Sequence, residues 1–288
     1  MKNINLIGYA LGSASNNDDC RLGPNYLLSH PHLFHDLGLS PHWQLTESFH
    51  SSKRGLEVLP DIFHSLKHIA LAVKEYGLAP QPTVVVGGDH SMAIGTWTGI
   101  MELYRHNGPL GLIWIDAHMD AHTPITSLSK NPHGMPLSYL LGLWEHPEFD
   151  FNHPKNLLKP EHVCLIGVRS YEAPEHQHLK ELGVKIYFMD EVAERGIGTV
   201  VQEAFDLIHP QVTQMGLTID LDAIDPDDCP GVGYREKPGI VLKDLVHFLK
   251  HFYFKKWAAL EIAEFNPLRD EDDKTAKAIV ELIDAVYF

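Results

Sequence analysis

The sequence predicts an α/β fold in which a parallel sheet lies between layers of helices. Short apolar runs recur along the chain without alternating polar residues, which is typical of strands covered on both faces of a parallel sheet. Stretches with helical spacing of apolar residues separate these runs, and such alternation favours parallel strands joined by helices. No internal repeat or linker-like segment interrupts the 288 residues. We therefore expect a single domain over residues 1–288.

Seven runs are expected to form strands: INLIGYA, TVVVGG, LGLIWI, HVCLIGV, VKIYFM, MGLTIDLD and WAALEIAEF, which begin at Ile4, Thr83, Leu110, His162, Val184, Met215 and Trp257. Six stretches are expected to form helices: 61–76, 94–104, 174–182, 198–208, 242–252 and 275–287. In the first of these, Ile62, Leu66, Ile69 and Val73 recur at the spacing of a buried helix face. Segments 13–24, 121–134, 145–159 and 225–239 are expected to be loops.

Charge and composition narrow the classes of function. The formal net charge of −15 disfavours a nucleic-acid partner, because phosphate binding needs concentrated Lys and Arg. The same charge would favour a cationic substrate, or would simply keep the protein soluble. No apolar run approaches the ~20 residues of a membrane span, and the first ten residues do not resemble a secretory signal. Three widely spaced cysteines without a C-x-x-C pair fit a reducing cytoplasm.

The first chemical motif follows the strand expected at Leu110. Asp116, His118 and Asp120 occupy alternate positions there, so a continued extended chain would point all three side chains to one side. An unpaired buried carboxylate is costly, so such a cluster needs compensating positive charge. The motif therefore predicts a cation site, with a helix cap or a polar loop cluster as the alternative.

Two other strand ends carry residues of the same kind. Asp220 and Asp222 follow the sixth expected strand with the same period of two. The segment GGDHS follows the second, where the glycines allow a tight turn into a helix and His90 can enter the site. Asp89 is expected to orient a metal ligand, and Ser91 is a candidate helix cap. The segment lacks the pattern of a phosphate-binding loop.

Together, three strand ends supply six candidate metal ligands: His90, Asp116, His118, Asp120, Asp220 and Asp222. Their four carboxylates carry a charge of −4, which would balance two divalent cations. Oxygen-rich ligands with two imidazoles and no thiolate favour a fairly hard ion such as Mn²⁺. Two ions that share a water would lower its pKa toward neutrality. The sequence therefore predicts a binuclear hydrolase that uses a metal-bound hydroxide.

Five segments occur in the order and at the approximate spacing of the ureohydrolase family, which the chain resembles: GGDHSMAIG, WIDAHMDAHTP, NPHGMPLSYLLG, TIDLDAIDP and EIAEFNP. Within that family the chain is most similar to arginases. The resemblance implies a three-layer α/β/α fold with a central, mainly parallel eight-stranded sheet, assembled as a homotrimer or homohexamer. It also implies that the six ligands hold two Mn²⁺, with Fe²⁺ or Co²⁺ as alternatives, and that L-arginine is cleaved to ornithine and urea.

The resemblance implies further catalytic residues. His133, in NPHGMP, matches a histidine that carries protons to the leaving amine, a task suited to imidazole near neutral pH. Glu264, in AEFNP, matches the glutamate that binds the guanidinium, whose planar donors pair well with a carboxylate. Glu261 is the weaker candidate, because an odd separation puts it on the other face of a strand. Asp120 is expected to serve catalysis through the metal centre.

Four residues are expected to contact the far end of the substrate. The resemblance assigns Ser129 and Asn131 to the substrate carboxylate and Glu172 to its α-amino group. His122 is the fourth, and it stands where arginases commonly have asparagine. Tyr234 replaces a smaller residue in the loop that follows the second Asp motif. These departures concern the choice of substrate rather than the metal chemistry.

Other functions are the alternatives to an arginase. Within the family these are an agmatinase, another guanidino-acid hydrolase or a formiminoglutamate hydrolase. Binuclear metallophosphatases also use D-x-H, but the chain lacks their G-N-H-[DE] segment. A regulatory homologue without catalysis would show substituted ligands, whereas all six are present. We expect a cytoplasmic, metal-dependent C–N hydrolase of linear amidines, with a small cationic guanidino substrate and no nucleic-acid or membrane partner.

Overall fold

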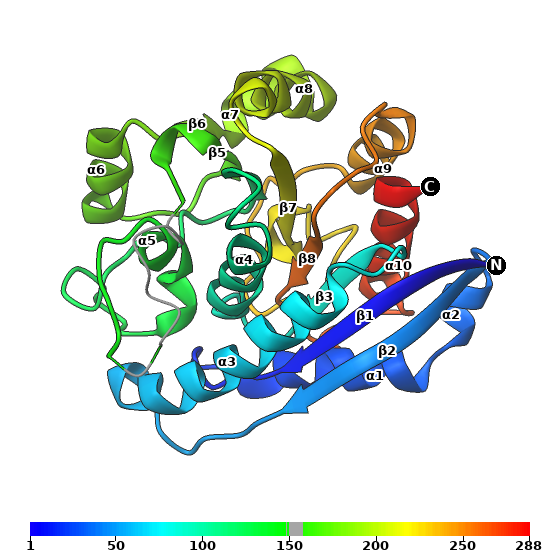
Figure 1. The fold of residues 1–288 in the computed structure, drawn as a ribbon, viewed down its shortest axis with the longest axis horizontal. Coiled ribbons are helices and arrows are strands. Elements are labelled where there is room, and N and C mark those ends of the chain that lie inside the picture. Colours follow the sequence, from blue (N-terminus) through cyan, green and yellow to red (C-terminus); the bar gives the residue numbers. More distant parts are fainter. Residues whose placement is uncertain (148, 150–157) are drawn as a thin grey trace.

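Eight parallel strands form the centre of the molecule (Figure 1). The computed structural model describes residues 1–147, 149 and 158–288, without the side chains of residues 45–47. The strands are β1 (Lys2–Ala10), β2 (Leu39–Ser48), β3 (Thr83–Gly87), β4 (Leu110–Ile115), β5 (Val163–Val168), β6 (Lys185–Phe188), β7 (Gln214–Asp220) and β8 (Leu260–Ala263). They lie in the order β2-β1-β3-β8-β7-β4-β5-β6, and each neighbouring pair is parallel.

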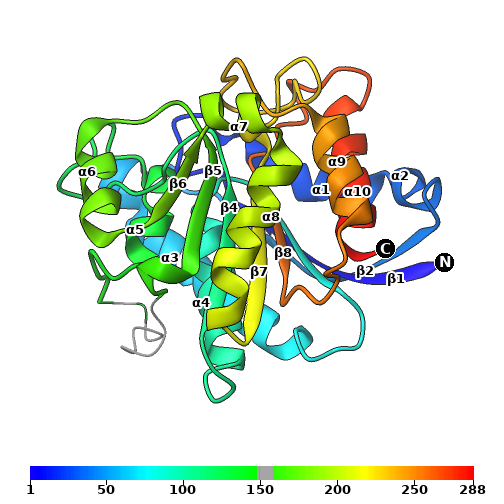
Figure 2. The same ribbon diagram turned by 90° about the horizontal axis from the view of Figure 1, so that it is seen from above.

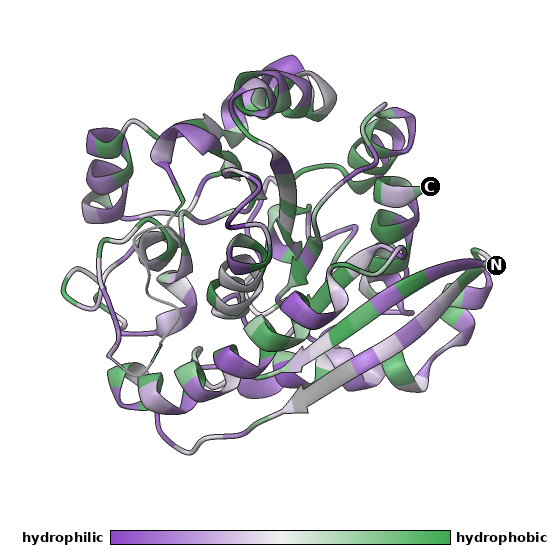
Figure 3. Cartoon of the chain, viewed as in Figure 1, coloured by the Kyte–Doolittle hydropathy of each residue, from purple (hydrophilic) through white to green (hydrophobic). Residues whose placement is uncertain are grey.

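Helices cover both faces of this sheet (Figure 2). They are α1 (Gly23–Ser29), α2 (His32–His35), α3 (Leu59–Tyr76), α4 (Met92–Leu103), α5 (Pro136–Leu140), α6 (Ala173–Leu182), α7 (Met189–Arg195), α8 (Ile197–Ile208), α9 (Leu242–His251) and α10 (Lys274–Tyr287). Along β3, Val84 and Val86 belong to the buried cluster that includes residues of α8, α9 and α10, whereas Val85 belongs to the cluster that includes residues of α3 and α4. Both strand faces are therefore apolar, as the colouring of Figure 3 shows for the central strands.

The predicted three-layer α/β/α fold is confirmed, with a sheet that is parallel throughout the described pairs. The seven expected strands and six expected helices are present, with ends that differ by a few residues. No helix in the described part of the chain is long and apolar enough to cross a membrane. Of the expected loop 145–159, residues 148 and 150–157 lie outside the described residues.

The sequence prediction missed one strand and several short helices. Strand β2 contains Pro41 and no apolar run, and it lies at the edge of the sheet, where it pairs with β1 alone. An edge strand tolerates proline because one of its sides needs no ladder hydrogen bonds. Helices α1, α2, α5 and α7 span seven residues or fewer, too short for a periodic pattern. The expected loop 13–24 contains a 3-10 helix, Asp18–Leu22, and the start of α1.

Gly88 joins three strand ends beside the carboxyl edge of the sheet. Its backbone N–H donates to the carbonyl oxygen of Tyr9 at 2.6 Å, and its carbonyl accepts from the backbone N–H of Glu264 at 2.8 Å. A Cβ on this residue would lie 1.7 Å from the carbonyl oxygen of Leu11. This close approach of backbones requires glycine, which confirms the role predicted for the GGDHS turn.

Replacing Gly88 by alanine is therefore expected to destabilise the protein by about 1–3 kcal/mol, because backbone atoms must move to admit the methyl group. Gly134→Ala is the matched control, since a Cβ there meets nothing within 4 Å. Denaturant unfolding measures both free energies. Equal stability of the two variants would contradict the close approach at Gly88.

Candidate metal centre and substrate pocket

The carboxyl ends of β3, β8, β7 and β4 meet at the centre of one sheet edge, which is where open parallel sheets place their ligand sites. Each of these four ends carries residues that the sequence singled out. His90 follows β3, Glu264 follows β8, Asp220 ends β7, and Asp116 follows β4. Adjacent strand ends therefore bring together residues that are up to 174 positions apart.

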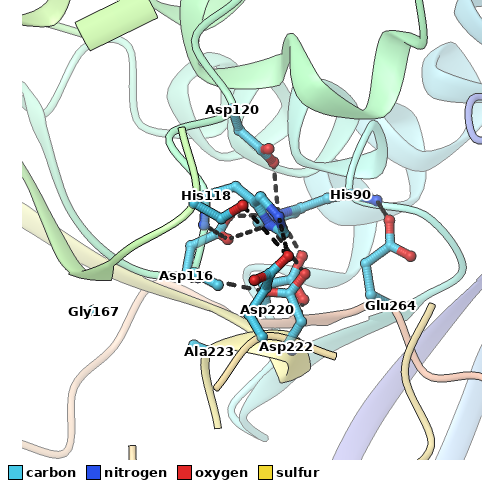
Figure 4. Close-up of polar contacts among 12 residues, drawn as sticks. His90, Asp116, His118, Asp120, Gly167, Asp220, Asp222, Ala223 and Glu264 are labelled. Atoms are coloured by element: carbon cyan, nitrogen blue, oxygen red, sulfur yellow. Dashed lines mark hydrogen bonds and ion pairs between the residues drawn. The ribbon is translucent and has the colours of Figure 1, made fainter. Parts of the chain in front are cut away.

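His90 lies at the centre of a buried group of carboxylates (Figure 4). Its Nδ1 atom is 3.2 Å from Oδ2 of Asp116, 2.9 Å from Oδ2 of Asp120 and 3.1 Å from Oδ2 of Asp220. The imidazole is 1% exposed. One ring nitrogen carries at most one proton, so hydrogen bonding cannot satisfy three carboxylates at once. A shared cation would satisfy all four groups.

A second group forms around His118. Its Nδ1 atom lies 3.1 Å from Oδ2 of Asp222 and 3.6 Å from Oδ1 of Asp116. Asp116 therefore belongs to both groups, each of which could hold one metal ion. A shared carboxylate is a suitable bridge between two divalent ions, and it supports the predicted binuclear arrangement.

The six predicted ligands converge, but not in the extended conformation that we predicted from their spacing. Strand β4 ends before Asp116, whose Oδ1 accepts the backbone N–H of His118 at 2.7 Å. Asp120 has a φ of 50°, in the left-handed region. Similarly, Asp220 Oδ1 accepts the backbone N–H of Asp222 at 2.9 Å, at the start of a 3-10 turn. Local aspartate turns, rather than strand periodicity, orient these side chains.

The donor set fits a pair of divalent cations. His90 Nδ1 and Asp120 Oδ2 are buried, and neither makes a hydrogen bond to a described residue although they lie 2.9 Å apart. Burial and the nearby Asp116 raise the pKa of Asp120 to about 6. Burial, together with Asp222 and Asp116, also raises the pKa of Asp220. A cation beside such carboxylates would stabilise their ionised form and lower their pKa values.

Asp89 does not orient a metal ligand directly, contrary to our expectation. Its Oδ2 atom accepts the backbone N–H of Ala14 at 3.0 Å, and its Oδ1 accepts that of Ser91 at 3.1 Å. The Ser91 hydroxyl donates to Asp89 and makes no capping bond to α4. Asp89 therefore connects the segment after β1 to the turn that carries His90. The carbonyl oxygen of Ala14, in the same segment, accepts the backbone N–H of His133.

A pocket of about 360 Å³ opens above the metal centre. It is lined by four predicted ligands, by both other catalytic candidates and by all four far-end candidates: His118, Asp120, Asp220, Asp222, His133, Glu264, His122, Ser129, Asn131 and Glu172. His90 and Asp116 are not among its lining residues and are buried. The sequence prediction therefore selected residues that share one pocket.

Glu264 and His133 are in contact on one wall of this pocket. Oε1 of Glu264 accepts the backbone N–H of His90 at 3.0 Å and lies 3.2 Å from Nδ1 of His133. Burial lowers the pKa of His133, but the contact with Glu264 and the charges of Asp120 and Asp89 together outweigh it, so the net pKa is raised. Glu261 does not line the pocket: its Oε1 accepts from Nε1 of Trp97 at 3.1 Å inside the core.

The four residues expected at the far end of the substrate contact one another in two pairs. Nε2 of His122 lies 2.5 Å from Oε2 of Glu172, and the hydroxyl of Ser129 accepts the backbone N–H of Asn131 at 3.3 Å. The ring of Tyr234 stacks on His133, with centroids 5.8 Å apart and an angle of 25°. Tyr234 therefore forms a side wall of the pocket next to the Glu264–His133 pair.

The polar or charged lining residues that sequence reasoning missed include Asn16, Glu175 and Glu236. Glu175 had a local signal: it is the third helical residue after Glu172 in a capping box at the start of α6. Asn16 and Glu236 lie in loops whose positions depend on contacts distant in sequence. No local pattern identifies them.

Comparisons with known proteins point to one family. A family model described as "Arginase family" matches residues 2–288. The chain is 33% identical over 305 residues to the arginase of Bacillus caldovelox, covering 100% of this chain and 98% of that protein. The structure of that arginase has a TM-score of 0.86 at 32% identity, covering 100% of this chain and 98% of that one.

Two further proteins are also similar to this chain. The arginase of Bacillus subtilis is 38% identical over 204 residues, covering 70% of this chain and 68% of that protein. The structure of formimidoylglutamase from Bacillus subtilis has a TM-score of 0.79 at 20% identity, covering 99% of this chain and 86% of that one. This last likeness concerns the fold alone.

Proposed function

The chain belongs to the arginase family, and we propose that it hydrolyses the guanidinium group of L-arginine to ornithine and urea with the help of two Mn²⁺ ions. The observation that carries the proposal is that Glu264, His133 and four residues of the carboxylate–imidazole cluster line one pocket. Guanidinium hydrolysis needs an anionic anchor, a proton carrier and an activated water in one place. The similarity to two bacterial arginases supports arginine as the substrate.

Six residues would hold the metal ions: His90, Asp116, His118, Asp120, Asp220 and Asp222. Mn²⁺ suits their four carboxylates and two imidazoles, with Fe²⁺ or Co²⁺ as alternatives. When bound, two such ions lower the pKa of a shared water and supply a hydroxide nucleophile near neutral pH. The net acidity of the chain, −15, favours the approach of the ions and of a cationic substrate.

Glu264 binds and orients the guanidinium. Glu264 is 4% exposed, and it lines the pocket beside the metal centre. A guanidinium stays charged at all relevant pH values and offers parallel N–H donors, so it forms a charge-assisted pair with this carboxylate. The left-handed backbone of Glu264, with a φ of 66°, turns its side chain away from the strand direction of β8.

His133 carries the proton that the leaving amine needs. In the reaction, the oxygen of water bonds to the guanidinium carbon and the bond from that carbon to the side-chain nitrogen breaks. That nitrogen leaves as an amine and must gain a proton. His133 lies 3.2 Å from Glu264, so its ring is next to the bound guanidinium. An imidazole with a raised pKa retains a proton to donate near neutral pH.

The far end of the substrate meets polar and acidic groups. Ser129 and Asn131 offer donors to a carboxylate, and Glu172 with His122 faces the α-amino group. No Lys or Arg is among the described residues that line the pocket. This acidity also suits agmatine, which has an amine and no carboxylate, and makes an agmatinase the second candidate.

A side-by-side substrate assay tests the proposal. The protein is reconstituted with Mn²⁺, and urea release is measured from L-arginine, agmatine and 4-guanidinobutyrate. We expect L-arginine to have the highest kcat/KM and 4-guanidinobutyrate the lowest, since the pocket offers its lone carboxylate no cation from Lys or Arg. Turnover of agmatine but not of L-arginine would replace the arginase proposal with an agmatinase.

The proposal includes a cytoplasmic location and an oligomeric assembly. Cys20, Cys164 and Cys229 are free and buried, as expected of a protein in the reducing cytoplasm. A homotrimer or homohexamer is our prediction for the assembly, and light scattering after gel filtration would measure its mass.

A further inference from the structure

Each of the two imidazoles of the metal centre, His90 and His118, has a glutamate carboxylate on the side of its Nε2 atom. His90 Nε2 lies 3.2 Å from the hydroxyl of Thr218, and that hydroxyl donates to Oε1 of Glu261 at 2.7 Å. His118 Nε2 lies 3.8 Å from Oε1 of Glu236. Both rings direct Nδ1 toward the aspartates. The ring of His90 is thus connected to Glu261 through the hydroxyl of Thr218 inside the core, and the ring of His118 faces the carboxylate of Glu236 in the pocket.

Glu236 is held in this position by contacts with the metal-centre turns. Nη2 of Arg169 donates to the carbonyl oxygen of Glu236 at 2.9 Å and to that of Asp222 at 2.8 Å. The hydroxyl of Ser170 donates to Oε1 of Glu236 at 3.3 Å. A single guanidinium therefore ties the loop that carries Glu236 to a predicted metal ligand. The carboxylate faces His118 because its backbone and its side chain are both fixed.

We propose that Glu236 is a positioning residue for the metal ion held by Asp116, His118 and Asp222. Its carboxylate attracts the proton of His118 to Nε2 and so leaves the lone pair of Nδ1 directed at the ion. A carboxylate behind a metal-bound imidazole fixes the tautomer and raises the basicity of the ligand atom. The inference rests on the proposed function, because it requires divalent ions in the cluster.

The expected effect is confined to one of the two ions. Loss of such a supporting group lowers metal affinity by about 10- to 100-fold. The 3.8 Å separation exceeds a hydrogen bond, so we expect about tenfold. The ion held by His90 should keep its affinity, since the support of that ring passes through Thr218 and Glu261 on the other side of the centre.

Glu172 provides a matched control for charge. It lines the same pocket and carries the same carboxylate, but it contacts His122 rather than a metal-ligand imidazole. Glu172→Gln therefore removes one negative charge from the pocket without touching the support of His118. A long-range effect of charge would act in both variants, whereas the proposed contact acts only in Glu236→Gln.

The experiment is a Mn²⁺ titration of the full chain after removal of metal with a chelator, in which the electron paramagnetic resonance signal counts free Mn²⁺. We expect two ions in the wild type and in Glu172→Gln with equal affinities. Glu236→Gln should bind one ion as the wild type does and the other about tenfold more weakly. Ser170→Ala, which releases the Glu236 carboxylate, should weaken the same ion to a smaller extent.

Two results would overturn the inference: wild-type affinity for both ions in Glu236→Gln, or equal weakening in Glu172→Gln. Thermal unfolding of the metal-free variants checks their folding, and Ser170→Ala decides the matter if Glu236→Gln does not fold. A wild-type protein that binds no Mn²⁺ would instead contradict the proposed metal centre. The failure of the inference and that of the proposed function are therefore distinguishable.

Discussion

Replacement of Asp120 or Asp222 by alanine is expected to abolish tight binding of one Mn²⁺ ion and to reduce urea release by about a thousandfold or more. Each residue places a carboxylate oxygen about 3 Å from the ligand nitrogen of one imidazole, at 2.9 Å for Asp120 and 3.1 Å for Asp222. Loss of an ion removes several kcal/mol of transition-state stabilisation, and about 4 kcal/mol corresponds to a thousandfold. Elemental analysis after gel filtration measures the metal content beside the activity.

Asp227→Ala is the control for these variants. Asp227 lies on the loop after the second Asp motif, its side chain is 80% exposed, and its carboxylate pairs with Lys237 rather than with the cluster. It should retain two ions and full activity. Full activity of Asp120→Ala or Asp222→Ala without bound metal would contradict the hydroxide mechanism.

Stability measurements separate metal binding from folding in the Asp120 variant. The folded-state pKa of Asp120 is raised to about 6, above the value of 3.8 in model compounds. A raised carboxyl pKa means that the charged form opposes folding, so above about pH 6 the ionised side chain destabilises the metal-free protein. Asp120→Ala should therefore melt no lower than the wild type without metal at pH 8. With Mn²⁺, the wild type should gain more stability, because it binds the ions more tightly.

The sequence predicted the chemistry of the site better than its geometry. The ligand types and their positions at strand ends were visible because polar residues stand out where buried apolar runs stop. The conformation after β4 was not visible, because Asp116 binds the backbone N–H of His118 and turns the chain out of the strand direction. Local side-chain hydrogen bonds compete with extended structure in a way that spacing alone does not reveal.

Loop residues of the pocket were predicted only where the family resemblance or its motifs marked them. His133 and Glu264 lie in such motifs, and both line the pocket. Glu236 lies in a loop that Arg169 fixes through a contact 67 residues away in sequence. Tyr234, on the same loop, was noted as a departure, but its stacking on His133 depends on the path of that loop. Long-range contacts of this kind leave no periodic pattern in the sequence.

Glu264→Gln is expected to lower kcat/KM for L-arginine by about a hundredfold or more while both Mn²⁺ ions remain bound. The substitution keeps the size of the side chain and removes the charge that pairs with the guanidinium. Loss of one partner of a buried charge pair costs about 2–5 kcal/mol, and about 3 kcal/mol corresponds to a hundredfold. Urea release and a Mn²⁺ titration of the same preparation measure the two quantities.

Glu261→Gln is the control that tests whether Glu264, rather than Glu261, binds the guanidinium. Glu261 is the other buried glutamate of this segment, but its Oε1 accepts from Thr218 behind His90 instead of facing the pocket. Its substitution should weaken Mn²⁺ binding, whereas Glu264→Gln should lower kcat/KM for L-arginine and leave Mn²⁺ binding unchanged. If Glu261→Gln keeps its metal and loses affinity for arginine, the guanidinium site has been assigned to the wrong glutamate.

The titration of His133 adds a readout that does not depend on turnover. Burial lowers the pKa of His133, whereas contact with Glu264, at 3.2 Å, raises it together with the charges of Asp120 and Asp89, and the net pKa is raised. Without the Glu264 charge, one of the contributions that raise this pKa is lost, so the pKa of His133 in Glu264→Gln should fall below its wild-type value. Nuclear magnetic resonance of the metal-free protein measures this midpoint. An unchanged midpoint would mean that the two residues are not coupled, and His133 would then need another partner to keep its proton for the leaving amine.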